Sequence, residues 1–436
     1  MARLAPYSIA HLRSLLLQAR QSAWSITEYF AYPLMMFGAT PFFLHLLGTE
    51  QYGRWMLLLT FGGFGGLVGL GMGTAAIKEV SAFRGRGDLN GAANAVRNCL
   101  AVTLASSLAL SALFLIIGLL AAPNLLTRMG EPAQVRVIVV AACMLLALEQ
   151  IDTVFTGAIR GLERFDISAR IEATAKLILV GSSLAAAWWT RDLCTVLWTT
   201  ITITVLRALA KCAIATKLLH TGALWPRWQS DHIARVFAFG KWTWAQSIGA
   251  AMFATADRLI VGSLMGADAL ARYSVCLQLA QQVHTVPAAA AQVLFPMISR
   301  RNAQRREVLP LVKRAMLWSI LLAALLALPM VAFRHAILTI WVGSAIADQS
   351  SGVLGLLAIG FALLAINNVP HFVLLGFDDA RLVAWCNIGA GIFALLIGLW
   401  FIPLVGLIGA AWARLGYAAA ICLLIVPMIN RLKQAK

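Results

Sequence analysis

Apolar windows of about 20 residues recur along this whole chain, and they constrain its fold more than any other feature. A helix of that length crosses the hydrocarbon core of a bilayer. Hydrophobic residues make up 61% of the 436 residues, charged residues only 12%, and the mean hydropathy is +0.82. A soluble domain has roughly 45 to 50% apolar residues, so the chain is predicted to be an all-α integral membrane protein.

About twelve transmembrane helices are predicted, joined by connections too short to hold a folded domain. The predicted segments are residues 24–47, 53–77, 97–121, 135–159, 169–189 and 194–218, then 237–262, 269–297, 313–333, 352–375, 382–402 and 407–430.

The basic residues predict the orientation in the membrane. About 25 of the 35 Lys and Arg residues fall on the side that carries both termini, and about six fall on the opposite side. Cytoplasmic loops retain Lys and Arg, so both termini are predicted to be cytoplasmic. The net charge of +17 then reflects topology and attraction to anionic membrane lipids, and nucleic acid is not expected as a partner.

Two pairs of similar segments indicate an internal repeat. LLGTEQYGRW continues from the first segment through Gly48, and LMGADALARYSV continues from the seventh through Gly266, about 218 residues later. The pair ALEQIDTVF, from Ala147, and AINNVPHFV, from Ala365, has the same offset. We therefore expect two pseudo-symmetric six-helix lobes around a central cavity, an N-lobe at 1–218 and a C-lobe at 237–436, joined by a cytoplasmic linker at 219–236.

Several motifs carry a family resemblance across most of the chain. LLGTEQYGRWMLLLTF with GLGMGTAAIKEVS, RGLERFDISAR, ADRLIVGSLMGADALARYSV and AQVLFPMISR resemble the polysaccharide-transporter (Wzx-type flippase) family of the MOP superfamily. The resemblance implies a transporter that moves undecaprenyl-pyrophosphate-linked oligosaccharide from the inner to the outer leaflet of the bacterial inner membrane. Such export would serve O-antigen, lipopolysaccharide, capsule or exopolysaccharide synthesis, with a polysaccharide polymerase as a possible partner.

Charged residues within the apolar segments are the candidate functional residues. Inserting a charged side chain at the bilayer centre costs about 2.5 to 3.5 kcal/mol, so such residues usually have partners or a function. Asp257 and Arg258 are neighbours in sequence, yet adjacent helix positions point about 100° apart, so their partners must come from another helix or from substrate. Arg414 and Glu28 also lack a partner nearby in sequence. We predict that Arg258 and Arg414 bind substrate and that Glu28 and Asp257 couple ion movement. The alternative is that Asp257 and Arg258 lie near the outer surface.

Two further groups lie on neighbouring predicted helices. Arg207 and Lys211 are four residues apart, a like-charged pair that an anion would relieve, and they are candidate substrate-binding residues. Glu149 and Asp152 are three residues apart and are candidate ion-coupling residues. Mutual neutralisation of these acids and bases is an equally weighted alternative.

Other chemistry is not expected. His284 and His371 are more often packing residues than ligands, and the seven cysteines form no metal-ligand spacing, so no metal, cofactor or catalytic residue is predicted. An enzyme acting on lipid-linked sugars would usually have a large extramembrane domain, whereas the longest outer loop, residues 335–350, has about 16 residues. The stronger alternative is a proton- or sodium-coupled exporter of small cations, similar to the MATE transporters.

Overall fold

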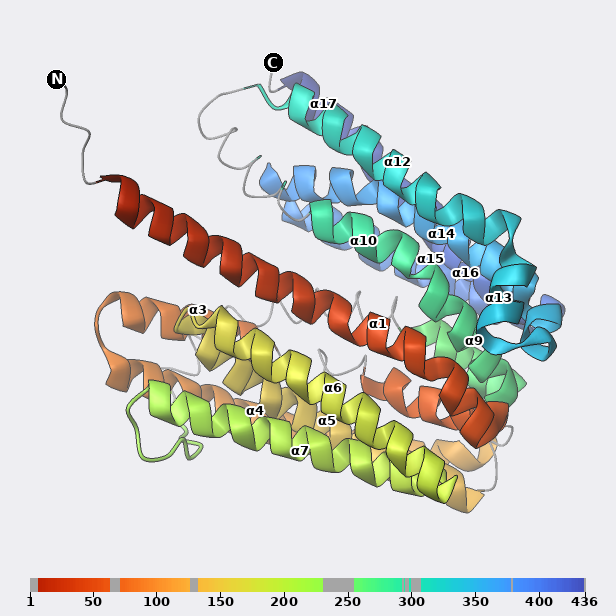
Figure 1. The fold of residues 1–436 in the computed structure, drawn as a ribbon, viewed down its shortest axis with the longest axis horizontal. Helices are drawn as coiled ribbons and strands as arrows, with labels where there is room; N and C mark the ends of the chain where they lie inside the picture. The colour runs from red at the N-terminus through yellow and green to blue at the C-terminus, as the bar shows by residue number, and fades with distance from the viewer. Residues whose placement is uncertain are drawn as a thin grey trace. The chain divides into compact units, whose positions relative to one another are not determined.

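In the described part of the chain, every regular element is helical (Figure 1). The computed structural model describes the backbone of residues 7–62, 71–125, 132–229, 255–291, 294, 298, 307–377 and 379–434. Side chains are described in these ranges except at residues 7–32, 61–62, 121–125, 132, 289–290 and 380.

The chain divides into two compact units. The first unit comprises residues 1–39, 65–115 and 141–244, and the second comprises residues 40–64, 116–140 and 245–436. The helices up to residue 229 are α1 (Tyr7–Gly62), α3 (Met72–Gly85), α4 (Leu89–Leu125), α5 (Pro132–Gly161), α6 (Phe165–Thr190) and α7 (Leu193–Leu218). The lobe and linker boundaries expected from the sequence remain a prediction.

The remaining helices lie in the second unit. They are an unlabelled helix over residues 255–265, α9 (Ala267–Ala280), α10 (Gln282–Ala291), α12 (Leu309–Ala332), α13 (Arg334–Val342), α14 (Ser344–Gly376), α15 (Ala380–Val405), α16 (Leu407–Ile421), the short η2 (Cys422–Leu424) and α17 (Ile425–Gln434). Residues 335–350, which were expected to form an outer loop, are mostly helical in the structure. They belong to α13 and to the first turns of α14, and Gly343, with φ of 97°, separates the two helices.

Eight segments of the described chain are long and apolar enough to cross a membrane: α4, α5, α6, α7, α12, α14, α15 and the run from α16 to α17. Each coincides with one of the predicted segments, which confirms a multi-pass helical membrane protein. The total of about twelve helices remains a prediction.

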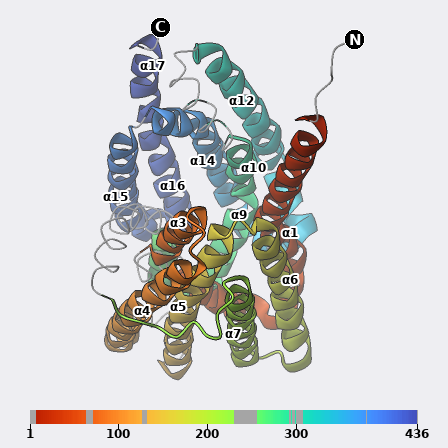
Figure 2. The same ribbon diagram turned by 90° about the vertical axis from the view of Figure 1, so that its left-hand side faces the viewer.

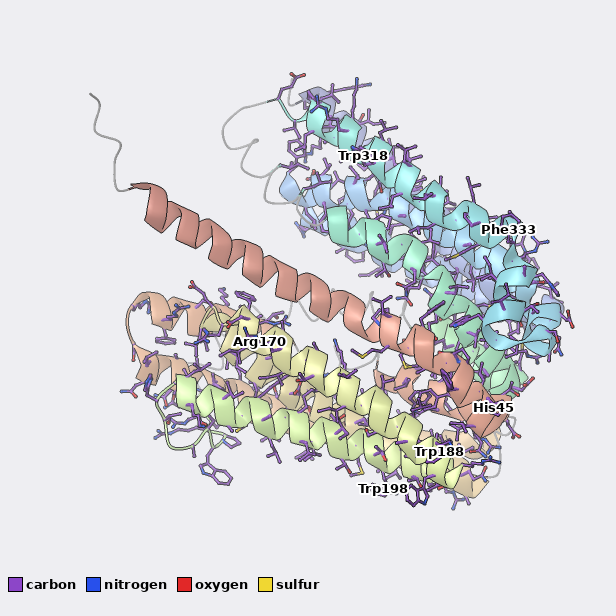
Figure 3. All side chains as sticks on the ribbon, viewed as in Figure 1. His45, Arg170, Trp188, Trp198, Trp318 and Phe333 are labelled. Carbon is purple, nitrogen blue, oxygen red and sulfur yellow. The ribbon has the colours of Figure 1, made fainter. Side chains whose placement is uncertain are left out.

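Helix α14 is the central helix of the second unit. It packs against α9, α10, α12, α13 and α16, and 67% of the residues in its apolar window are buried, against 17% in α12 and 22% in α15 (Figure 2). A helix that is apolar on all sides and enclosed by other helices is a core element. Large apolar side chains on the outer helices, such as Trp188, Trp198 and Trp318, are exposed and suited to lipid contact (Figure 3).

One of the two similar segment pairs has a matching backbone turn. Gly48 breaks α1 with φ 76° and ψ 166°, and Gly266 precedes α9 with φ 89° and ψ −175°. An acid two residues after each glycine pairs with an arginine four residues further on: Glu50 with Arg54, and Asp268 with Arg272. The same turn therefore occurs in both halves, and each time it uses a backbone conformation that favours glycine.

Candidate functional site

The predicted site residues with described side chains fall into two groups, one in each unit. The first group contains the predicted Glu149, Asp152, Arg207 and Lys211, and the structure adds Glu172 and Lys176, which were not predicted as site residues; we call these six residues the N-terminal charge cluster. The second contains Asp257, Arg258 and Arg414.

Lys211 is the centre of the N-terminal charge cluster. Its side chain is fully buried, and its ammonium group donates to Asp152 Oδ2 at 2.6 Å, to Thr156 Oγ1 at 2.8 Å and to a carboxylate oxygen of Glu172. These three acceptors use all three N–H bonds of the ammonium. Lys211 therefore ties α7 to both α5 and α6.

Arg207 extends the same cluster one helical turn away on α7. Its Nε donates to Asp152 Oδ1 at 3.2 Å, and its Nη2 lies 2.8 Å from Glu149 Oε1. The i, i+4 spacing of the two bases and the i, i+3 spacing of the two α5 acids place each pair on one helix face. The ion pairs between them show that these two faces meet. Lys176 adds a longer contact of 3.9 Å to Glu172.

Three acids and three bases make this cluster formally neutral. Neutralisation is the arrangement that the sequence left as an alternative, and the geometry now places every member within ion-pair distance of an opposite charge. Substrate binding by Arg207 and Lys211, and ion coupling by Glu149 and Asp152, remain predictions.

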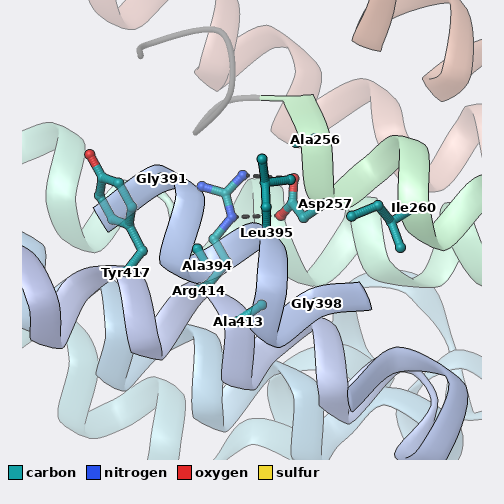
Figure 4. Close-up of a pocket in the computed structure, with 10 residues that line it drawn as sticks. All are labelled: Ala256, Asp257, Ile260, Gly391, Ala394, Leu395, Gly398, Ala413, Arg414 and Tyr417. Atoms are coloured by element: carbon teal, nitrogen blue, oxygen red, sulfur yellow. Dashed lines mark hydrogen bonds and ion pairs between the residues drawn. The ribbon is translucent and has the colours of Figure 1, made fainter. Parts of the chain in front are cut away.

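In the second unit, Asp257 pairs with Arg414 of α16 (Figure 4). The guanidinium donates through Nε at 2.6 Å and through Nη2 at 3.2 Å, while the Tyr273 hydroxyl donates to the same carboxylate. The Asp257 and Arg414 side chains are only 11% and 7% exposed. Arg414, which has no partner nearby in sequence, thus has one from a distant helix, and a two-point pair of this kind fixes geometry as well as charge.

Arg258 lies beside this pair with a different environment. Its backbone N–H donates to Asp257 Oδ1 at 2.9 Å, but its side-chain Nε is buried and has no hydrogen-bond partner among the described residues. Asp257 is the one acid of this group, and it already bonds Arg414. The group of Asp257, Arg258 and Arg414 therefore carries a formal charge of +1.

Glu28 lies on α1, but its side chain falls outside the described residues, so its predicted role in ion coupling remains a prediction. Among the described residues, no group of three or more His, Cys, Asp or Glu side chains has the arrangement of a metal site.

A polar cavity in the second unit was not predicted from the sequence. It has a volume of about 460 Å³, and α10, α14, α15 and α16 supply its lining. We call it the amide pocket, after three of its six polar residues: His284, Asn367, Asn368, His371, Asn387 and Tyr417. The available signal was the pair of asparagines in AINNVPHF, since adjacent amides are costly in an apolar helix unless they have partners.

Sequence comparisons match this chain to a protein family and to a curated relative. The model described as "Polysaccharide biosynthesis protein" matches residues 19–301. A relative from Shigella flexneri, named "Putative O-antigen transporter", is 22% identical over 401 residues, covering 90% of this chain and 93% of that protein.

Solved structures show the same fold at low identity. The lipid II flippase MurJ in an inward closed conformation has a TM-score of 0.78 at 10% identity, over 94% of this chain and 87% of that one. An inward-facing multidrug resistance MATE family transporter of the MOP superfamily has a TM-score of 0.71 at 15% identity, over 94% of this chain and 95% of that one. The family model spans well over half of the sequence, and the chain belongs to the polysaccharide biosynthesis protein family, with the fold of the MOP superfamily transporters.

Proposed function

We propose that this protein is a flippase that moves undecaprenyl-pyrophosphate-linked oligosaccharide from the inner to the outer leaflet of the bacterial inner membrane, by alternating access. Family membership and the names of the Shigella flexneri relative and of MurJ support this assignment. The product would feed surface polysaccharide assembly.

The proposal depends most on Arg258, whose buried side-chain Nε has no hydrogen-bond partner among the described residues. A pyrophosphate-linked substrate is an anion, and its passage calls for a positive charge at membrane depth that no protein acid already neutralises. Among the described residues, the N-terminal charge cluster is balanced, whereas the group of Asp257, Arg258 and Arg414 has one base in excess. The planar guanidinium of Arg258 offers the forked donors that match phosphate oxygens.

A cation exporter is the second candidate, because the fold is also that of a multidrug MATE transporter. The charges favour the flippase instead. A transported cation would be repelled by the net positive group in the second unit, and the neutral cluster in the first unit offers it no acid that lacks a basic partner.

Flipping in proteoliposomes tests the proposal. The purified chain is reconstituted with undecaprenyl-pyrophosphate-linked oligosaccharide, and the fraction of lipid reachable by an external sugar-oxidising reagent is followed over time. The wild-type protein should move this lipid and should not move ethidium. Transport of ethidium without any transport of the lipid would replace the flippase with the exporter.

Arg258 variants connect the activity to the charge. Arg258→Ala should reduce the flipping rate at least tenfold, whereas Arg258→Lys should lose less because it keeps the charge but not the fork. Arg381→Ala is the matched control, since Arg381 is exposed at the start of α15. Normal flipping by Arg258→Ala, at normal membrane abundance, would remove Arg258 from the pathway.

A further inference from the structure

We infer that the amide pocket binds an uncharged sugar ring of the transported oligosaccharide, separately from the group that holds the pyrophosphate. This inference rests on the proposed function and adds to it a second subsite with a defined ligand chemistry.

The pocket has the size and the neutral composition of a site for a small uncharged molecule. Its volume of about 460 Å³ lies within the range of about 300 to 1,000 Å³ that is usual for small-molecule sites. None of the described residues that line it is Asp, Glu, Lys or Arg. A site without fixed charge does not suit a pyrophosphate, a carboxylated sugar or a cationic drug, because each would lose hydration without gaining an opposite charge.

Two polar atoms of this lining lack hydrogen-bond partners in the described part of the chain. Asn367 and Asn368 are 5% and 8% exposed, and neither Oδ1 of Asn367 nor Nδ2 of Asn368 has a hydrogen-bond partner among the described residues. Leaving such an atom unpaired costs about 1 to 3 kcal/mol, so an unpaired acceptor and an unpaired donor on adjacent residues need an explanation. A sugar hydroxyl can donate to the first and accept from the second.

Hydrogen bonds from neighbouring residues hold two of the pocket's amides in place. His284 Nε2 lies 3.0 Å from Asn368 Oδ1, a hydrogen bond that leaves the amide nitrogen of Asn368 as its unpaired group. Across the pocket, the Tyr417 hydroxyl donates to Asn387 Oδ1 at 2.9 Å, and Asn387 Nδ2 donates to the Val383 carbonyl at 2.7 Å. His284 is thus a positioning residue for one of the two candidate ligand-binding amides.

The remaining lining is apolar and aromatic, including Leu364, Phe372 and Ile388. A hexose ring has C–H groups on its faces and hydroxyls around its edge. A pocket with apolar walls and a few fixed neutral donors and acceptors matches that pattern.

The repeat offers a comparison within the chain. Asn367 and Asn368 lie 218 residues after Glu149 and Gln150, and Glu149 belongs to the N-terminal charge cluster. At this offset the ion-paired Glu149 corresponds to Asn367, whose Oδ1 has no partner among the described residues, and Gln150, itself an amide, corresponds to Asn368. An amide at position 367 is therefore not a constant feature of the repeated segment.

The test uses the full-length protein in nanodiscs prepared without sugar-headed detergents. Four probes share one octyl chain and differ in the head group: octyl β-glucoside, octyl β-N-acetylglucosaminide, octyl β-glucuronide and octyl phosphate. We expect the wild-type protein to bind at least one of the two uncharged glycosides at least tenfold more tightly than the glucuronide, which corresponds to about 1.4 kcal/mol.

Variants then locate this binding. Asn367→Leu and Asn368→Leu keep the branching of the side chain and remove the unpaired atoms, and each should weaken binding of the uncharged glycoside at least tenfold. Gln281→Leu is the matched control, because Gln281 is an exposed amide in the same unit and does not line the pocket. Asn368→Asp is similar in shape and keeps an acceptor for His284, but it replaces the unpaired donor with a carboxylate oxygen, so it should also lose the glycoside.

The outcomes separate the two proposals. Equal binding of charged and uncharged glycosides by the wild-type protein, or unchanged glycoside binding in folded Asn367→Leu and Asn368→Leu, would overturn the sugar subsite. Flipping of the lipid-linked oligosaccharide would then still stand. Competition of tetraphenylphosphonium with the glycoside, combined with no lipid flipping, would overturn both. The wild-type comparison needs no variant, so the inference can fail even if the variants do not fold.

Discussion

Replacing Lys211 with methionine should destabilise the protein strongly, because its ammonium is the buried partner of two carboxylates. Lys211→Met keeps the length of the side chain but removes the charge and three donated hydrogen bonds. Asp152 and Glu172, with side chains 4% and 11% exposed, would share the cluster with Glu149, and two bases would remain for three acids.

The expected loss follows from this imbalance. Removing one partner of a buried ion pair costs about 3 to 5 kcal/mol, mainly because the remaining charge stays buried. At about 2 to 4 °C per kcal/mol for a domain of roughly 150 to 250 residues, the midpoint of thermal unfolding should fall by about 6 to 20 °C. The measurement is thermal unfolding of the purified protein in one detergent at one scan rate.

Two variants give this experiment its controls. Arg431→Met removes an exposed two-point pair with Asp379, in which Arg431 is 46% exposed, and it should cost less than about 1 kcal/mol. The double variant Lys211→Met/Glu172→Gln returns the cluster to neutrality and should recover more than half of the loss. Lys211→Met unfolding within about 3 °C of Arg431→Met would refute the reasoning.

The double variant also separates structure from transport. If the N-terminal charge cluster only stabilises the fold, Lys211→Met/Glu172→Gln should flip lipid at a rate close to that of the wild-type protein. If acids of the cluster couple transport to an ion gradient, the double variant should be stable, and its flipping rate should no longer respond to a pH or sodium gradient.

Three further predictions concern other parts of the chain. Gly48→Ala and Gly266→Ala should each lower the free energy of unfolding by about 1 to 3 kcal/mol, because φ is positive at both turns. Gly38→Ala is the control and should not lower it, because Gly38 lies on a regular helix with open space around it. Equal unfolding midpoints for all three variants would contradict this prediction. Arg414→Met should destabilise more than Arg414→Met/Asp257→Asn, measured by the same thermal unfolding, since the double variant leaves no unpaired acid. A potassium-diffusion potential, negative on the cytoplasmic side, should speed flipping: moving roughly two negative charges outward gains about 4 to 5 kcal/mol per 100 mV, and rates indifferent to potential would exclude this coupling.

Composition and periodicity alone were sufficient for the class of this protein and for most of its helices. A run of about 20 apolar residues has few stable states other than a membrane helix, because backbone groups in lipid must bond within their own segment. The similar segments that contain Gly48 and Gly266 could also be recognised from the sequence. The structure adds that both glycines have a positive φ.

The partners of the charged residues could not be predicted from the sequence. The spacing of Arg207 and Lys211, and of Glu149 and Asp152, placed each pair on one helix face, yet it left open whether the faces meet. Side-chain direction along one helix follows from its period, but the partner across a helix interface depends on how separate helices pack.

Tertiary structure alone decided which charges are neutralised and where a neutral cavity forms. Arg414 pairs with Asp257 across 157 residues of sequence, whereas Arg258, the neighbour of Asp257, has an Nε with no partner among the described residues. Asn367 and Asn368 become candidate binding residues only because they line a cavity to which four helices contribute. Each of these facts depends on contacts between residues far apart in the chain, and the free energy of a buried polar group is set by those contacts and not by its neighbours in sequence.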